Sequence, residues 1–346
     1  MKKNSGLRTT SRTATPWDDL KYEKLDPLQR LLQQKYREHF FDRHLKLSET
    51  DEAKFLNQFE LTTCRRCGSD NIIHFGTKNK LNRYYCKDCR HTFVITTNTI
   101  FDCHKLSVEQ WIEYCLDLFG FASTNLTSKT NKNSESTANY WLNKVFLLLK
   151  DYGDDIKVSG QVQIDEKYYK ERANKIQRKP DGKEFSGLSR NQYCIFMACD
   201  DHMHVYAHVN GSGKPSQKRC WESLGSHIEP GSHLIHDKER SHSILIRKLN
   251  LTSDAYDSKV IDRLPDKDNP LHLINSYHSL LEKFLNAHSG FDREHLQDYI
   301  NLFMYLYNGS EVPLERVYQL IKMGLTKPIT LRYRELYHAD DTKKCQ

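Results

Sequence analysis

Four cysteines stand in two Cys-x-x-Cys pairs, and this arrangement is the most specific chemical signal in the sequence. The pairs are Cys64 with Cys67 and Cys86 with Cys89, and eighteen residues separate them. Two such pairs can place four thiolates tetrahedrally around one zinc ion. A redox pair is the less favoured alternative, because redox Cys-x-x-Cys motifs occur singly at the start of a helix. We therefore predict a structural zinc site here.

The segment around these cysteines is basic and also carries aromatic side chains. Basic side chains that neutralise phosphates release counterions, and this release drives affinity for DNA. The pattern favours a DNA-binding ribbon, with a protein-binding ribbon as the alternative. The basic residues are Arg65, Arg66, Lys78, Lys80, Arg83, Lys87 and Arg90, and the aromatic residues are Phe75, Tyr84, Tyr85 and Phe93.

Two carboxylates further along the chain each end a strand-like segment. Asp165 ends the alternating run QVQID, and Asp237 ends the run HLIHD. Acids at the carboxyl ends of separate strands can bridge divalent ions, and their hard oxygen ligands favour Mg²⁺. The alternative for either acid alone is a turn or cap residue, because Asp is common at strand ends.

A later segment has the spacing of an amphipathic helix with one polar face. A buried helix whose polar stripe points at two carboxylates is what a metal site requires. The alternative is a stripe that simply faces water. The apolar face comprises Leu273, Tyr277, Leu280, Leu281 and Phe284, and the polar face comprises Asn275, His278, Ser279 and Glu282.

The overall composition bounds the kind of protein that carries these residues. With 346 residues, 38% of them hydrophobic, the chain has room for two or three modules. The net charge of +7 suits a polyanionic partner without proving one. We find neither an apolar stretch of the roughly 20 residues that a membrane span needs nor an apolar signal core, and we expect a soluble cytoplasmic protein. The other cysteines lack ligand spacing and are expected to be buried apolar side chains: Cys103, Cys115, Cys194, Cys199, Cys220 and Cys345.

Changes of pattern along the chain mark five regions. Ser107 and Gln110 form a capping-box arrangement, and with Gly120 they bound a predicted helix. The polar run TSKTNKNSES connects it to a second helix, which favours a helix-turn-helix-like DNA-binding region, with a plain helical spacer as the alternative. We predict an N-terminal helical region with a disordered start (1–60), the zinc ribbon (61–100), this helical region (101–153), an α/β domain (154–310) and a C-terminal helical tail (311–346).

The α/β region alternates strand and helix patterns. A strand, a hairpin turning at Asp200 and Asp201, another strand and then helices predict a mixed sheet flanked by helices. Between Glu166 and Gln192, eight basic residues stand against three acidic ones. This segment is interpreted as a flap that contacts DNA, with a solvated charged loop as the alternative.

Together these motifs resemble the DDE-type insertion-sequence transposases that carry a zinc ribbon and an RNase H-like catalytic domain. The resemblance runs from about Cys64 to Asn308. Its landmarks are CRRC and CKDC, then FVITTNTIF, IDEKYY and HLIHD, and finally HLINSYHSLL continuing to HLQDYINLFMYLYN.

The resemblance implies an RNase H-like fold in which Asp165 and Asp237 hold catalytic Mg²⁺, with Mn²⁺ as a substitute. Most DDE enzymes have Glu at the third position, but one branch uses Asn, and Asn275 resembles that branch. The branch usually carries Lys two turns further along the helix, where this chain has Glu282 followed by Lys283. Glu166 points to the opposite side of its strand and is a weaker candidate.

The resemblance also implies an activity. Such an enzyme binds the ends of its element on double-stranded DNA, cuts them and joins them to a target by phosphoryl transfer, working as a homo-oligomer at the bacterial nucleoid. Two alternatives are a non-enzymatic DNA-binding descendant of a transposase and a structure-selective nuclease on the same fold.

Overall fold

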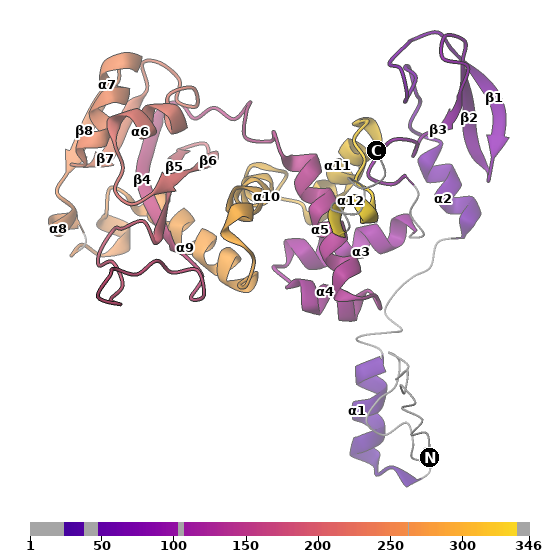
Figure 1. The fold of residues 1–346 in the computed structure, drawn as a ribbon, viewed down its shortest axis with the longest axis horizontal. Coiled ribbons are helices and arrows are strands. Elements are labelled where there is room, and N and C mark those ends of the chain that lie inside the picture. Colours follow the sequence, from indigo (N-terminus) through magenta and orange to yellow (C-terminus); the bar gives the residue numbers. More distant parts are fainter. Residues whose placement is uncertain (1–23, 38–47, 103–106, 262, 338–346) are drawn as a thin grey trace. The chain divides into compact units, whose positions relative to one another are not determined.

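The computed structural model describes residues 24–37, 48–102, 107–261 and 263–337 (Figure 1). The chain divides into two compact units, Met1–Trp141 and Leu142–Gln346, and the division falls inside one helix. The expected disordered start, as well as Cys103 and Cys345, lie outside the described residues. In the described ranges, no helix is both long enough and apolar enough to cross a membrane.

The first unit begins with two helices and a small sheet. Helix α1 spans Pro27–Arg37 and α2 spans Glu49–Leu56, where the Ser48 side chain caps α2 by accepting from the Asp51 backbone. Strands β1 (Ile72–Lys78), β2 (Leu81–Cys86) and β3 (Thr92–Val94) form an antiparallel sheet in that order. Its buried core consists of Cys64, Cys86 and Phe93. A core this small gives little hydrophobic stabilisation, so the module depends on its cysteine site.

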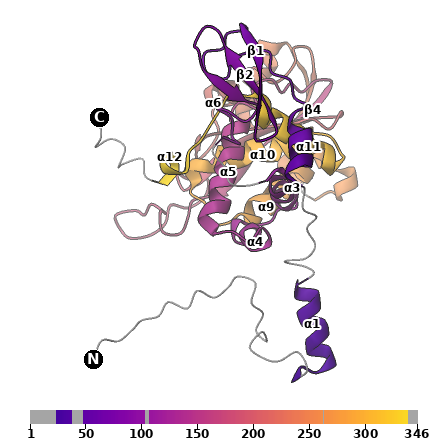
Figure 2. The same cartoon turned by 90° about the vertical axis from the view of Figure 1, so that its right-hand side faces the viewer.

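Two helices and the first part of a third complete the first unit, and the three lie side by side in both views (Figure 1 and Figure 2). They are α3 (Val108–Phe119), α4 (Thr124–Thr130) and α5 (Glu135–Leu149). Trp111 and Trp141 stack at 5.2 Å between ring centroids, and the Tyr114 hydroxyl donates to the Ala138 carbonyl. The predicted capping box of Ser107 and Gln110 is confirmed.

The polar run between the two predicted helices is not simply a connection, and this prediction is corrected. Its first residues belong to α4, which Ser123 caps through the Leu126 backbone. The Asp117 carboxylate on α3 accepts hydrogen bonds from the side chains of Thr130 and Asn131. A polar segment can therefore be helical here, because a carboxylate of the neighbouring helix satisfies its buried polar groups.

The second unit is built on a five-stranded mixed sheet in the order β6-β5-β4-β7-β8. The first three strands pair antiparallel, whereas β4 with β7 and β7 with β8 pair parallel. This is the strand order of an RNase H-like sheet, which confirms the expected fold class. The strands are β4 (Gln161–Lys170), β5 (Gln192–Asp200), β6 (Val205–Ser212), β7 (His233–Asp237) and β8 (Thr252–Tyr256).

Helices cover both faces of this sheet, and β4 shows how the faces divide. Successive side chains of a strand point to opposite faces. Asp165 faces His278 of α9, whereas the charge of Glu166 acts on Cys220 of α6. The helices are α6 (Gln217–Leu224), α7 (Ser243–Leu249), α8 (Ser258–Ile261), α9 (His272–Ala287), α10 (Leu296–Asn308), α11 (Pro313–Thr326) and α12 (Tyr333–Tyr337).

The remaining predictions about buried cysteines and the hairpin agree with the structure. Cys115, Cys194, Cys199 and Cys220 are free and buried. The predicted hairpin is formed by β5 and β6, and the chain turns between Asp200 and Val205.

Candidate active site and metal centre

The four predicted zinc ligands come together in the first unit. Their sulfur atoms all lie within 4.8 Å of one another. Cys64 and Cys89 are 3.6 Å apart, and so are Cys67 and Cys86, measured between Sγ atoms. A tetrahedral zinc ion with Zn–S bonds of about 2.3 Å holds its sulfurs about 3.8 Å apart. The cluster therefore fits one zinc ion.

Two turns of the same design present these sulfurs. Gly68 and Arg90 follow the second cysteine of each pair with φ of 77° and 58°. Their backbone N–H groups donate to the carbonyls of Cys64 and Cys86. Only glycine adopts this left-handed backbone freely, so the conformation of Arg90 is less favourable by about 1 kcal/mol. In the second turn, the Cys89 backbone N–H donates to the Cys86 sulfur and helps to lower the pKa of that thiol to about 7. A stabilised thiolate is the form that binds a metal.

In the second unit, the sheet brings Asp165 and Asp237 together. Strands β4 and β7 are parallel neighbours in which Ile164 pairs with His236, so the next residue on each strand is one of the two acids. The side chains of Asp165 and Asp237 are 28% and 24% exposed. Burial, with added repulsion from Glu166 and Asp237, raises the pKa of Asp165 to about 7. Carboxylates crowded in this way suit a divalent cation, because the cation would offset their repulsion with hard oxygen ligands at hand.

Helix α9 lies along β4 through three successive polar contacts. The Gln163 side chain accepts from the Ile274 backbone N–H at 3.0 Å. Next, Asp165 faces His278, with 3.7 Å between Oδ2 and Nδ1. The third contact joins Lys167 to a glutamate of α9. Successive contacts are two residues apart on the strand, a rise of about 6.7 Å, and four residues apart on the helix, a rise of about 6 Å. Because the two rises are nearly equal, all three contacts can form.

The third contact decides the role of Glu282. Its Oε2 lies 2.7 Å from the Nζ atom of Lys167. The resemblance leads us to expect a lysine of α9 at this place, whereas here a lysine of β4 meets a glutamate of α9. Glu282 is thereby held in an ion pair with the strand that carries Asp165.

The polar stripe of α9, predicted to point at the two carboxylates, divides in the structure. His278 is buried at 8% exposure and faces Asp165 of β4, whereas Asn275 and Ser279 are exposed. Burial, with repulsion from Lys167, lowers the pKa of His278 to about 3 and keeps the ring neutral. Ile274 is fully buried, whereas Leu273 and Leu280 are only partly buried. The helix is rotated from the prediction because the strand that it covers is itself polar.

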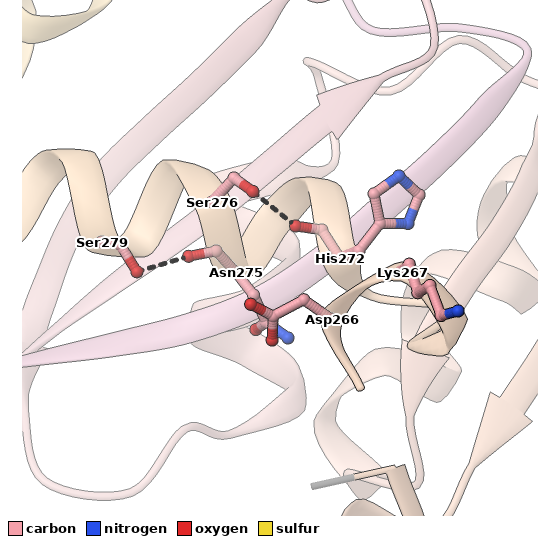
Figure 3. A pocket seen from close by; sticks show the side chains of 6 residues that line it. All are labelled: Asp266, Lys267, His272, Asn275, Ser276 and Ser279. Atoms are coloured by element: carbon pink, nitrogen blue, oxygen red, sulfur yellow. Dashed lines mark hydrogen bonds between the residues drawn. The ribbon is translucent and has the colours of Figure 1, made fainter. Parts of the chain in front are cut away.

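Asn275 has a different environment from His278. It is exposed and lines an open pocket of about 260 Å³ (Figure 3). Asp266, which comes from the short 3-10 helix before α9, lines the same pocket (Figure 3). The contact that α9 makes with Asp165 comes from His278, one turn further along. The pocket is lined by Asp266, Lys267, His272, Asn275, Ser276 and Ser279.

Sequence reasoning missed a buried histidine beside the two carboxylates. His242 ends the short 3-10 helix Arg240–His242 that follows β7, and its side chain is 1% exposed. Its Nε2 lies 3.1 Å from Oε1 of Glu166, and its Nδ1 lies 3.5 Å from Oδ1 of Asp237. Burial alone would lower the pKa of His242, but the hydrogen bond to Glu166 and the nearby acids outweigh it and raise the pKa. The five-residue spacing from Asp237 was visible in the sequence, but the partner Glu166 was not.

His236 also lies next to His242, with 3.1 Å between the two Nδ1 atoms. Burial, with repulsion from His242, lowers the pKa of His236 to about 4. Donor atoms of His236, Asp237 and His242 lie within 4.8 Å of one another, a spacing that a metal ion could also use. Nε2 of His242 contacts Glu166, so His236, Asp237 and His242 form one network with the Glu166 carboxylate.

The basic segment after β4 is partly neutralised by its own acids. Glu184 pairs with Lys170 and Arg178, with 3.3 Å between the charged atoms in each pair. Lys175 pairs with Asp292. These contacts reduce the charge that the segment presents, and its role as a DNA-contacting flap stays a prediction.

Fold and site together define a domain of the DDE transposase type. Residues 157–308 match the model of the ISXO2-like transposase domain. The resemblance to DDE-type insertion-sequence transposases is thereby confirmed, and the chain is a transposase by class.

Relatives of the chain come from mobile elements. An uncharacterized protein in the transposable element ISH50 of Halobacterium salinarum is 22% identical over 278 residues, which cover 74% of this chain and 90% of that protein. A pre-cleavage Mos1 transpososome structure is 13% identical over 62% of this chain and 78% of its own, with a TM-score of 0.27. The structure of the Mos1 transposase catalytic domain with raltegravir and Mg is 14% identical, covers 65% of this chain and 96% of that chain, and also has a TM-score of 0.27.

Proposed function

We propose that this protein is an active insertion-sequence transposase that binds the ends of its own element, cuts them in a Mg²⁺-dependent reaction and joins them to target DNA. The observation that carries the proposal is the juxtaposition of Asp165 and Asp237 on adjacent parallel strands of a transposase domain. The raised pKa of Asp165 supports it, because crowded carboxylates on neighbouring strands are suited to a cation.

Asp165 and Asp237 would hold the metal through their carboxylates, and Asn275 would offer its amide oxygen as the third group. A bound divalent metal supplies charge stabilisation for the attacking and leaving oxygens of a phosphodiester. Mn²⁺ would replace Mg²⁺, since both accept carboxylate and carbonyl oxygens. The residues of this chain then have to orient the carboxylates and position the DNA strand.

The first unit would recognise DNA. The four cysteines would hold one structural zinc ion, and the ribbon and the helices α3 to α5 would bind the element end. Several basic side chains support this role because they are exposed on the ribbon: Arg66, Lys78, Lys80, Lys87 and Arg90. Such side chains bind duplex DNA by neutralising phosphates. A homo-oligomer working at the nucleoid follows from the reaction, because two element ends have to be held together.

The test is cleavage and joining of a DNA duplex that carries the sequences flanking the gene, with Mg²⁺ present. The wild type is compared with Asp165→Asn and Asp237→Asn, which keep side-chain size and remove charge. Joined products from the wild type, lost in both variants with DNA binding unchanged, are the expected result. Binding without any cleavage by the wild type would instead identify a non-enzymatic descendant. Cleavage of branched DNA without joining would identify a nuclease.

A further inference from the structure

Beside the two carboxylates of the proposed active site lies a chain of side chains that starts from Glu166. Glu166 comes directly after Asp165, but its side chain points to the other face of β4, where it is 5% exposed. Its Oε1 meets Nε2 of His242 at 3.1 Å. The opposite side of the same imidazole ring faces Oδ1 of Asp237 at 3.5 Å. One buried ring therefore connects an acid on β4 with an acid on β7.

Further contacts hold Asp237 and the ring of His242. The other contact of the same Asp237 oxygen is the backbone N–H of Glu239, at 3.0 Å. The ring of His242 is fixed in its plane by Glu166 on one side and by His236 and Asp237 on the other. Asp237 is thus held from two directions on its own strand end. A carboxylate that must hold a cation gains most from such support, because its oxygens then need no reorganisation when the cation binds.

The position of Glu166 argues against a direct part in the metal site. Asp165 faces the side of the sheet covered by α9, whereas the charge of Glu166 acts on Cys220 and Cys194 among the buried residues of the other side. Because its carboxylate accepts a hydrogen bond from Nε2 of His242, Glu166 has a defined partner inside the domain.

We propose that His242 is a positioning residue for the proposed transposase reaction, and that it orients the carboxylate of Asp237 while Glu166 orients His242. The inference rests on the proposed function, because its main test measures DNA cleavage. It assigns an indirect role to Glu166, the acid adjacent to Asp165, and a role to a histidine that contacts no substrate.

The experiment measures how cleavage by the full-length protein depends on Mg²⁺ concentration. His242→Ala and Glu166→Ala should each raise the Mg²⁺ concentration needed for half-maximal cleavage by about 10- to 100-fold, the usual cost of losing an outer partner of a metal ligand. Glu166→Gln should stay near the wild type, because the amide oxygen still accepts from Nε2 of His242. The double variant Glu166→Ala with His242→Ala should lose no more than the worse single variant, since both changes break one chain.

A matched control comes from the same strand. His233 on β7 also bonds an acid, Asp254, with 3.2 Å between Nε2 and Oδ2, but it lies four residues before Asp237. His233→Ala should leave the Mg²⁺ dependence unchanged. Circular dichroism and thermal unfolding establish that each variant is folded, and if His242→Ala fails to fold, the pair Glu166→Ala and Glu166→Gln decides the same question.

Three results would overturn the inference. One is a Mg²⁺ curve for His242→Ala that overlays the wild type. Another is a Glu166→Gln variant as inactive as Glu166→Ala, which would make Glu166 a direct ligand. The third is one equivalent of transition metal beyond the ribbon zinc in the wild type that is lost in His242→Ala, which would make the histidine a ligand. If the wild type does not cleave at all, the proposed function fails, and calorimetric titration of the same variants with Mn²⁺ still tests the inference.

Discussion

The side chain of Gln163 on β4 accepts a hydrogen bond from the backbone N–H of Ile274 at 3.0 Å, which fixes the first turn of α9 against the strand that carries Asp165. Both residues are buried, at 7% and 0% exposure. The contact sets the register in which His278 comes to face Asp165. It is therefore the contact on which the geometry of this side of the site depends.

Removing this hydrogen bond should lower the free energy of unfolding more than removing the ion pair between Lys167 and Glu282. Gln163→Leu leaves the buried Ile274 N–H without its acceptor, and we expect a loss of about 1–3 kcal/mol in the free energy of unfolding. Glu282→Gln breaks a partly exposed pair with Lys167 and should cost less than about 1 kcal/mol. Urea unfolding of the two variants measures both values. Equal losses would show that the hydrogen bond does not hold α9.

Asn275 provides a prediction about the third position. Asn275→Ala should lower Mg²⁺-dependent cleavage by at least about tenfold, or about 1.4 kcal/mol of transition-state stabilisation. Asn275→Asp should retain activity, because it keeps an oxygen at the same place. Ser276→Ala is the matched control, since Ser276 lines the same pocket and its hydroxyl donates to the His272 carbonyl of its own helix. Full activity of Asn275→Ala would remove Asn275 from the site.

The ribbon should depend on its metal. Cys64→Ser should reduce zinc from one equivalent per chain to a small fraction and weaken DNA binding, because zinc supplies on the order of 10 kcal/mol of folding free energy to such modules. Cys115→Ser is the control: Cys115 is buried in α3 outside the cluster and should leave the zinc content unchanged. Mass spectrometry of metals and a DNA-binding assay make the comparison. Unaltered zinc in Cys64→Ser would contradict the assignment.

His288 should make the domain less stable in mild acid. Burial lowers its pKa from 6.5 to about 4, so the unfolded chain takes up a proton that the folded chain excludes. The stability is fully present above pH 6.5 and is lost as pH falls towards 4, by about 1.4 kcal/mol per pH unit for this group. His288→Phe, which retains the ring contacts with Phe284 and Tyr299, should flatten this part of the curve. Parallel pH profiles of unfolding for the two proteins would contradict the prediction.

The amino-acid sequence alone determined the features that depend on local spacing. The two Cys-x-x-Cys pairs predicted the cluster, and the alternation of apolar residues placed Asp237 at the end of its strand, as the structure shows. The prediction that Asp165 also ends a strand is wrong, because β4 continues to Lys170 through its pairing with β5. Such patterns are readable because turns and strands impose short, fixed periods on side-chain direction. The order of strands and helices likewise predicted the mixed sheet.

Tertiary structure alone decided which distant side chains meet. Helix α9 rotates so that His278, rather than Asn275, contacts Asp165, because the polar residues of β4 offer partners to a buried polar side chain. The meeting of Glu166 with His242 across 76 positions follows from the parallel pairing of β4 and β7. The polar run that became α4 depends on Asp117 of the preceding helix. Spacing along a chain defines the faces of an element, but the partner of each face is set by the packing of all elements at once.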